Sequence, residues 1–429
     1  LKCAFFYHKR GKMLPKYYKT QLKNKLEIYF VPLNKGSNVI NVDVFYKVGS
    51  RDETLGKTGM AHMLEHLNFK STKNHKAGDF DKIIKGFGGT NNASTGFDYT
   101  HYYIKASKDN LDKSLELFAD MMENLSLKNS EFEPERKVVI QERRWRTDND
   151  PYGTLYFKLF ESAFSYHSYH WLPIGYYEDI INWKIADIRK FWKTYYQPKN
   201  AFLIITGDTD KKTAFNLAKK HFANIPNRAN LPKFHQIEPK QTGAKKLIIH
   251  KESAVDILAI AFKIPNFKHP DNVALNALSQ YLSGGKSSIL ERELVDKKQL
   301  VNSINAFAMS LKDAGLFIFI AVCNPQISAK IVLKELNKII KSCKKDLIDE
   351  EELTKIKSAL KADLVYSMSQ ASTVASIFGN YIASGDIKDF YELENKSKNL
   401  SAQELKKIAK KYFNKTQKST IILKATNEK

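Results

Sequence analysis

The residues of this sequence best suited to chemistry form the run His62-Met63-Leu64-Glu65-His66. If the run is helical, its two histidines lie one turn apart and Glu65 lies beside them, within roughly 100° of arc. Two imidazoles so placed can bind zinc through ring nitrogens, and a carboxylate that is not a ligand can take a proton from water. The run therefore predicts a hydrolytic zinc centre, although five residues also fit an amphipathic helix with a polar face.

A third protein ligand is expected, because a catalytic zinc usually takes three protein ligands and keeps one position open. Candidates lie in the stretch 131–145, which reads as a helix with Pro134 near its start. Glu135 and Glu142 are seven residues apart, which puts them on one face but about 10 Å apart along the axis. The two glutamates are too far apart to bind the same ion. One should therefore be the ligand, and the other should lie outside the ligand set and hydrogen-bond to one of the ligands.

Together these motifs resemble those of the pitrilysin-type (inverzincin) metallopeptidases, specifically mitochondrial processing peptidase and its bacterial relatives. In that family a glutamate ligand follows H-x-x-E-H at a spacing close to that between His66 and Glu142, 142 − 66 = 76 residues. The resemblance covers nearly the whole chain and includes the runs 135–139 and 148–151. With these features combined, the surface-helix alternative loses most of its weight.

The resemblance implies a role for each residue of the motif. It makes His62, His66 and Glu142 the ligands of a Zn²⁺ cofactor and Glu65 the general base. It makes Glu135 the outer carboxylate that steadies a histidine. The implied activity is that of a metalloendopeptidase, and the implied substrate is a peptide.

The resemblance also implies a substrate-binding segment at Asn92, Ala93 and Ser94. In the family this stretch is an exposed edge strand that pairs with the peptide backbone near the scissile bond. Such pairing reads main chain rather than side chains, so sequence specificity is tolerant. Without the zinc motif, the same residues would read as an ordinary polar turn before a strand.

Length and composition indicate a globular protein. The 429 residues amount to two or more ordinary domains, and a hydrophobic content of 43% is ample for buried cores. No apolar run approaches the ~20 residues that span a membrane. Cys3, Cys323 and Cys343 are odd in number and far apart, so no disulfide framework is expected, and cytoplasmic and periplasmic or secreted locations both fit.

The formal net charge of +23 raises the question of polyanion binding. However, the lysines are spread over both halves, and no basic block is interleaved with aromatic residues. Solvated lysine faces explain this charge better, and we expect no nucleic-acid partner. A purely cationic substrate is also disfavoured unless a partner chain is acidic.

The pattern of apolar residues predicts an α+β fold with two homologous α/β domains, each a mainly antiparallel sheet flanked by helices. The expected parts are a tail at 1–16, a zinc-binding catalytic domain at 17–225, a proline-containing linker at 226–244, and a homologous domain without metal ligands at 245–429. Besides the helix of the H-x-x-E-H motif, the expected elements are strands at 25–31, 38–48, 99–106, 202–206, 246–250, 256–262, 315–322 and 419–423, and helices at 80–85, 110–125, 135–146, 185–196, 211–222, 273–282, 350–364 and 400–413.

The second half lacks two residues that the family usually supplies. The resemblance implies an arginine and a tyrosine, seven residues apart, that contact substrate or its developing oxyanion. Aligned on Gly284-Gly285 and Leu300, their positions hold Val295 and Asn302. Loss of one such donor can cost about 3 kcal/mol of transition-state stabilisation. We therefore expect a heterodimer in which a subunit of the same fold supplies both groups and the two chains close like a clam shell.

Two alternatives remain on these residues. One is a homodimeric peptidase that uses a nearby group such as Arg292. The other is a non-catalytic core subunit, because the same fold also builds structural subunits of respiratory complexes. Those relatives typically lose the histidines or glutamates that this chain retains. The favoured prediction is a zinc-dependent endopeptidase acting on short or unfolded polypeptides inside a dimer chamber.

Overall fold

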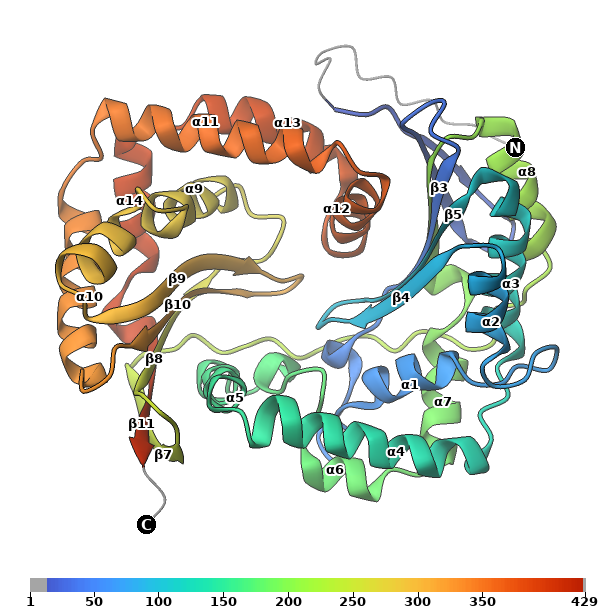
Figure 1. Ribbon diagram of the computed structural model, residues 1–429, viewed down its shortest axis with the longest axis horizontal. Coiled ribbons are helices and arrows are strands. Elements are labelled where there is room, and N and C mark those ends of the chain that lie inside the picture. Colours follow the sequence, from blue (N-terminus) through green and yellow to red (C-terminus); the bar gives the residue numbers. More distant parts are fainter. Residues whose placement is uncertain (1–13, 427–429) are drawn as a thin grey trace. The chain divides into compact units, whose positions relative to one another are not determined.

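The computed structural model describes residues 14–426 (Figure 1). Contacts between Cα atoms divide the chain into two compact units. The first contains residues up to 141 with 172–235 and 365–383, and the second contains 142–171, 236–364 and the residues from 384 on. Within 14–426, no helix combines the length and the apolar character that crossing a membrane requires. The tail expected at 1–16 lies outside the described residues except for 14–16.

The first unit is built on a six-stranded mixed sheet with the order β1-β2-β6-β3-β5-β4. Neighbouring strands are antiparallel except β2 and β6, which are parallel. The strands are β1 Tyr18–Gln21, β2 Glu27–Pro32, β3 Val39–Tyr46, β4 Thr90–Thr95, β5 Thr100–Ser107 and β6 Ala201–Gly207. Strand β4 is therefore an edge strand of this sheet.

Helices cover the sheet of the first unit. They are α1 Met60–Asn68, α2 Asp79–Gly86, α3 Leu111–Asn124, α4 Asn129–Arg143 (within this unit up to Gln141), α6 Tyr177–Asn182, α7 Ile185–Tyr195, α8 Lys211–Phe222 and α12 Ala371–Ser384 (within this unit up to Ala383). The apolar face of α1, including Met63 and Leu64, is fully buried in a core shared with Val42 and Ile104 of the sheet. Burial of this face leaves the polar face of α1 available for chemistry.

The second unit has a five-stranded mixed sheet with the order β7-β11-β8-β10-β9. Only β7 and β11 are parallel neighbours. The strands are β7 Lys245–Glu252, β8 Ile257–Ile264, β9 Val301–Ser310, β10 Gly315–Cys323 and β11 Lys418–Thr426. The helices are α5 Pro151–Ala163, α9 Asn272–Ser283, α10 Ala329–Lys345, α11 Glu350–Ser367 (within this unit up to Leu364), α13 Ile387–Lys398 and α14 Ala402–Tyr412. Cys323 and Cys343 are buried free thiols.

The two sheets share one topology. Strands β2-β6-β3-β5-β4 of the first correspond in order and direction to β7-β11-β8-β10-β9 of the second. Helix α9 follows β8 and precedes β9, as α1 follows β3 and precedes β4. This repetition confirms the predicted fold class of two sheet-and-helix domains with mainly antiparallel sheets.

Several elements differ from the expectation. Helix α4 begins at Asn129, so Pro134 lies inside the helix rather than near its start. A π-helical turn, residues 144–148, follows α4 and ends it earlier than predicted. Helix α5 is absent from the expected elements, although Asp150 caps it by accepting from the N–H of Gly153 (2.6 Å) and Pro151 opens it. Strands β1 and β9 and helices α6, α10, α12 and α13 are also additions to the expected elements.

The segment 226–244 has no helix or strand, but its polar side chains attach it to both units. Within the first unit, Arg228 lies 4.0 Å from the ring of Trp192 and donates to the carbonyl of Met122 (3.0 Å). Within the second unit, Glu238 accepts from the backbone N–H of Ser165 at 2.9 Å and from the two N–H groups that follow it, each at 3.0 Å. The domain boundaries expected from the sequence stay a prediction.

Candidate metal centre and active site

The start of helix α1 is held by buried carboxylates. Glu53, which is 2% exposed, accepts from the N–H of Gly59 and the N–H of Ala61, both at 2.8 Å. These N–H groups have no partner inside the helix, and a negative charge at a helix N-terminus is favourable. Asp179 accepts from the N–H and the hydroxyl of Thr58, at 2.9 and 2.6 Å. The orientation of α1 is therefore set before its first histidine.

Gly59 is required at this start because two backbone segments touch there. Its φ is +85°, and a Cβ at this position would lie 2.8 Å from the carbonyl oxygen of Ile174. A Cβ added to Gly175, whose φ is +75°, would lie 2.6 Å from the backbone of Thr58. Side chains at these two positions would separate the loop 173–175 from the start of α1.

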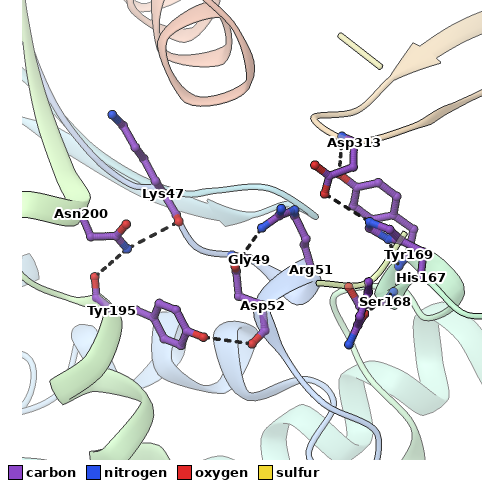
Figure 2. A network of polar contacts seen from close by, with 11 residues as sticks. Lys47, Gly49, Arg51, Asp52, His167, Ser168, Tyr169, Tyr195, Asn200 and Asp313 are labelled. Atoms are coloured by element: carbon purple, nitrogen blue, oxygen red, sulfur yellow. Dashed lines mark hydrogen bonds and ion pairs between the residues drawn. The ribbon is translucent and has the colours of Figure 1, made fainter. Parts of the chain in front are cut away.

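The loop before Glu53 forms a polar network on the first unit (Figure 2). Arg51 is 8% exposed, pairs with Asp52 (3.1 Å) and stacks on the ring of Phe234 at 3.5 Å. Asp52 in turn accepts from the N–H of Gly49 (3.2 Å), and its carbonyl accepts from the hydroxyl of Tyr195 (3.3 Å). This network fixes the residues that deliver Glu53 to the helix start.

Three donor atoms converge between helices α1 and α4. One ligand atom each from His62, His66 and Glu142 lie within 4.8 Å of one another, and all three side chains are half-buried. Glu142 directly follows Gln141 in the last turn of α4. The two Nε2 atoms of His62 and His66 are 3.3 Å apart. Two nitrogens bound to one tetrahedral zinc at about 2.0–2.1 Å are about 3.3–3.4 Å apart, so this donor set fits the ion.

Glu135 lies behind the histidines rather than among the converging atoms. Its Oε1 is 2.9 Å from Nδ1 of His66, and its Oε2 is 2.6 Å from Nζ of Lys70. Burial would raise the pKa of Glu135, but the hydrogen bonds from His66 and Lys70 outweigh it, and the pKa falls below its usual 4.5. A proton held on Nδ1 of His66 leaves its Nε2 lone pair free to bind a metal.

Glu65 occupies the same polar face of α1. Among the described residues, the donor atoms that converge closely enough to hold a metal come from His62, His66 and Glu142, and Glu65 is not in this group. Its Oε2 is 2.5 Å from the hydroxyl of Thr95, at the end of edge strand β4. A carboxylate beside a metal site but outside its ligand set can act as a base.

The expected substrate segment lies on β4, so the turn alternative is wrong. Asn92 and Ser94 are exposed, whereas Ala93 is half-buried against the core. The N–H of Ala93 donates to Oδ1 of Asn92 (2.9 Å). A peptide that accepted from this N–H would displace the Asn92 side chain.

Val295 and Asn302, which stand where the resemblance implies an arginine and a tyrosine, lie in the second unit. Val295 belongs to the π-helical segment Glu291–Lys297 and packs against the core, and Asn302 is exposed near the start of edge strand β9. Arg292 forms a 3.5 Å ion pair with Glu352 of α11. Neither Val295 nor Asn302 can supply a cation or a phenol.

Sequence reasoning named the converging residues but missed their supports: Glu53, Lys70, Thr95 and Asp179. Glu53 lies six residues before the N-cap residue Gly59, outside the capping-box spacing, and Lys70 lies beyond the end of α1, so neither carries a clear local signal. Thr95 and Asp179 reach α1 from distant segments, and their partners carry no local signal.

The chain is similar to known proteins and matches protein-family models. Residues 30–167 match the family model described as Insulinase (Peptidase family M16), and residues 182–360 match the one described as Peptidase M16 inactive domain. The zinc protease PqqE of Helicobacter pylori is 49% identical over 414 residues, 96% of this chain and 93% of that protein. A crystal structure of a protease from Helicobacter pylori, also 49% identical, matches with a TM-score of 0.94 over 96% of this chain and 100% of its own. The beta subunit of mitochondrial-processing peptidase from Lentinula edodes is 26% identical over 87% of this chain and 82% of that protein.

Proposed function

Since the chain belongs to peptidase family M16, we propose that it is a zinc-dependent endopeptidase that hydrolyses peptide bonds in short or unfolded polypeptides. The observation that carries this proposal is the convergence of donor atoms from His62, His66 and Glu142 within 4.8 Å, with Glu65 on the same face of α1. Two imidazoles and one carboxylate are a ligand set of catalytic zinc sites, which keep a fourth position open for water or substrate.

The chain's own residues divide the work of hydrolysis. When bound, zinc supplies Lewis acidity, which polarises the scissile carbonyl and makes water acidic near neutral pH. Glu65 takes the proton from the attacking water and returns it to the leaving amine. Glu135 holds the ring of His66 through Nδ1 and so presents Nε2 for the metal.

Edge strand β4 is the proposed substrate platform. Its outer side presents main-chain groups at Asn92, Ala93 and Ser94, because only its other side is paired, with β5. A peptide that adds a strand here must be extended, so a folded protein would first have to unfold locally. Main-chain pairing also favours tolerant sequence specificity.

The proposed assembly is a heterodimer that closes around a chamber. Val295 and Asn302 leave the chain without the arginine and tyrosine expected for substrate contact, and a second subunit of the same fold would supply them. A homodimer is the second candidate, in which Arg292 would have to leave its ion pair with Glu352. A non-catalytic core subunit is a weaker candidate, because both histidines and the glutamates of the motif are retained.

The decisive experiment measures zinc content and peptide cleavage on the purified chain and on Glu65→Gln. We expect one bound zinc in both proteins, slow cleavage by the chain alone and no cleavage by the variant. The matched control is Glu252→Gln, an exposed residue of β7 in the second unit, which should leave zinc and turnover unchanged. Zinc loss in Glu65→Gln would place Glu65 among the ligands, and a wild-type chain that binds no zinc would refute the proposal.

A further inference from the structure

Strand β4 has an inner row of side chains that face helices rather than solvent. Asn91, Ala93 and Thr95 are half-buried, and they alternate with exposed residues. Asn91 donates to Oδ1 of Asp81 on α2 (2.8 Å), and Ala93 packs on the core. The third member of the row, Thr95, contacts the carboxylate of Glu65 on α1. The strand that would bind the substrate is therefore hydrogen-bonded to the proposed base.

We propose that Thr95 is a positioning residue that holds the Glu65 carboxylate in place for proton transfer. This inference rests on the proposed peptidase function. The hydroxyl donates to Oε2 of Glu65, and a hydrogen bond to an ionised carboxylate is stronger than one between neutral groups. A glutamate has several rotatable bonds, and a base acts only within a narrow range of positions. Donation from Thr95 restricts the side chain, and the carboxylate retains lone pairs that can accept a proton.

In the second unit, α9 and β9 correspond to α1 and β4, and no catalytic chemistry is expected there. In α9, Ser283 accepts from the N–H of Ala306 in β9 (2.9 Å) and donates to its carbonyl (2.8 Å). Ser279 accepts from the N–H of Ala308 (3.0 Å). Those hydroxyls bind main chain, whereas the Thr95 hydroxyl binds a carboxylate. This difference in partner supports a role for Thr95 in orienting Glu65.

The test compares Thr95→Val, which removes the hydroxyl at nearly constant shape, with Thr95→Ser, which keeps it. We expect Thr95→Val to lower kcat about tenfold to a hundredfold with KM unchanged, and Thr95→Ser to restore most of the loss. The control is Thr194→Val on α7, which removes a hydroxyl bond to the carbonyl of Lys190 (2.8 Å) and should leave kcat unchanged. In a Glu65→Gln background, affinity for an uncleaved peptide should be the same with and without Thr95→Val.

Crystal structures of the zinc-loaded wild type and Thr95→Val give a readout independent of turnover. We expect one well-defined position of the Glu65 carboxylate in the wild type and a displaced or multiple position in Thr95→Val. An unchanged carboxylate, an unchanged kcat, or weaker peptide affinity in the Glu65→Gln background would each overturn the proposal. A wild type without peptidase activity, both alone and mixed with a same-fold subunit that carries the arginine and tyrosine, would instead refute the proposed function, and the carboxylate position would still decide the role of Thr95.

Discussion

At the scale of single residues, the proposed metal centre includes hydrogen-bonded residues beyond the three proposed ligands. The Oε1 of Glu135 is hydrogen-bonded to Nδ1 of His66 (2.9 Å), and its Oε2 forms an ion pair with Nζ of Lys70 (2.6 Å). Lys70 thereby restricts the rotation of the carboxylate that orients the ring of His66, a proposed metal ligand. Partners outside the ligand set commonly contribute about tenfold to a hundredfold in metal affinity.

Lys70→Met should therefore weaken zinc binding while leaving all three proposed ligands in place. We expect the dissociation constant for zinc to rise about tenfold, measured by competition with a chromophoric chelator. Glu135→Gln should weaken binding at least as much, because it removes the charge as well as one acceptor. Lys73→Met, at an exposed position on the same loop, is the control. Wild-type affinity in Lys70→Met would show that the ion pair does not support the site.

At the scale of elements, helix α12 completes the first unit although it lies far along the chain. The hydroxyl of Thr206 in β6 donates to the carbonyl of Ala371 at the start of α12 (3.1 Å). A Cβ at Gly379 would lie 2.0 Å from the ring of Phe45 in β3. That ring is stacked between His101 and Phe202, with centroids at 4.0 and 4.9 Å, so it cannot move aside.

Gly379→Ala should destabilise the protein even though alanine favours a helix. The intrinsic gain of roughly 0.5–1 kcal/mol is outweighed by overpacking, which costs about 1–3 kcal/mol in a rigid site. Gly86→Ala, at the end of α2 with nothing within 4 Å of the added Cβ, is the control and should be neutral or stabilising. Denaturant unfolding measures both. A stabilised Gly379→Ala would mean that α12 does not pack this closely on the sheet.

Glu238, which attaches the segment 226–244 to residues 165–167, makes a pH-dependent contribution to the stability of the folded protein. Burial would raise its pKa, but the backbone N–H groups of residues 165–167 and the charge of Lys263 outweigh it, and the pKa lies below the usual 4.5. A lowered pKa in the folded state means that ionised Glu238 stabilises the protein above pH 4.5. That stabilisation is lost as the pH falls through the folded-state value.

Glu238→Gln should therefore lower the free energy of unfolding by about 1–2 kcal/mol at pH 7, where the wild-type carboxylate is ionised. The difference between the two proteins should shrink as the pH falls below the usual pKa of 4.5, measured by denaturant unfolding at each pH. Glu252→Gln, at an exposed position of β7, should show no such dependence. A difference that stays constant with pH would contradict this role of the charge.

At the scale of the whole molecule, the two units repeat one topology, but among the described residues only the first unit's α1 contributes histidines to a donor set. The polar face of α9 is used for hydrogen bonds to β9, where α1 carries histidines and a glutamate. The second unit also lacks the arginine and tyrosine expected of it, at Val295 and Asn302. The proposed metal site, together with the absence of these two side chains, supports the proposal that the chain is one part of an assembly.

The chain alone should therefore cleave an unfolded peptide at least about a hundredfold more slowly than the chain mixed with a same-fold subunit that carries the arginine and tyrosine. The assay compares turnover of the separate and mixed proteins at equal zinc. Glu65→Gln in the mixture is the control and should abolish cleavage. Equal turnover by the chain alone would favour the homodimer.

The family, the fold class and the grouping of His62, Glu65 and His66 all follow from the order of amino acids. One helical turn brings these three side chains together whatever surrounds them. The fold class and the family are both confirmed. The repeated order of strands and helices in the two halves could likewise be predicted from the local spacing of apolar residues.

Which distant groups meet depends instead on the packed fold. Contacts such as Thr95 with Glu65, Asp179 with Thr58, and α12 with β3 join segments that share no local pattern. Helix α12 could not be placed in advance, since an apolar helix fits many sheet faces and only shape selects one. Local geometry follows from backbone periodicity, whereas long-range contacts follow from how the whole core packs.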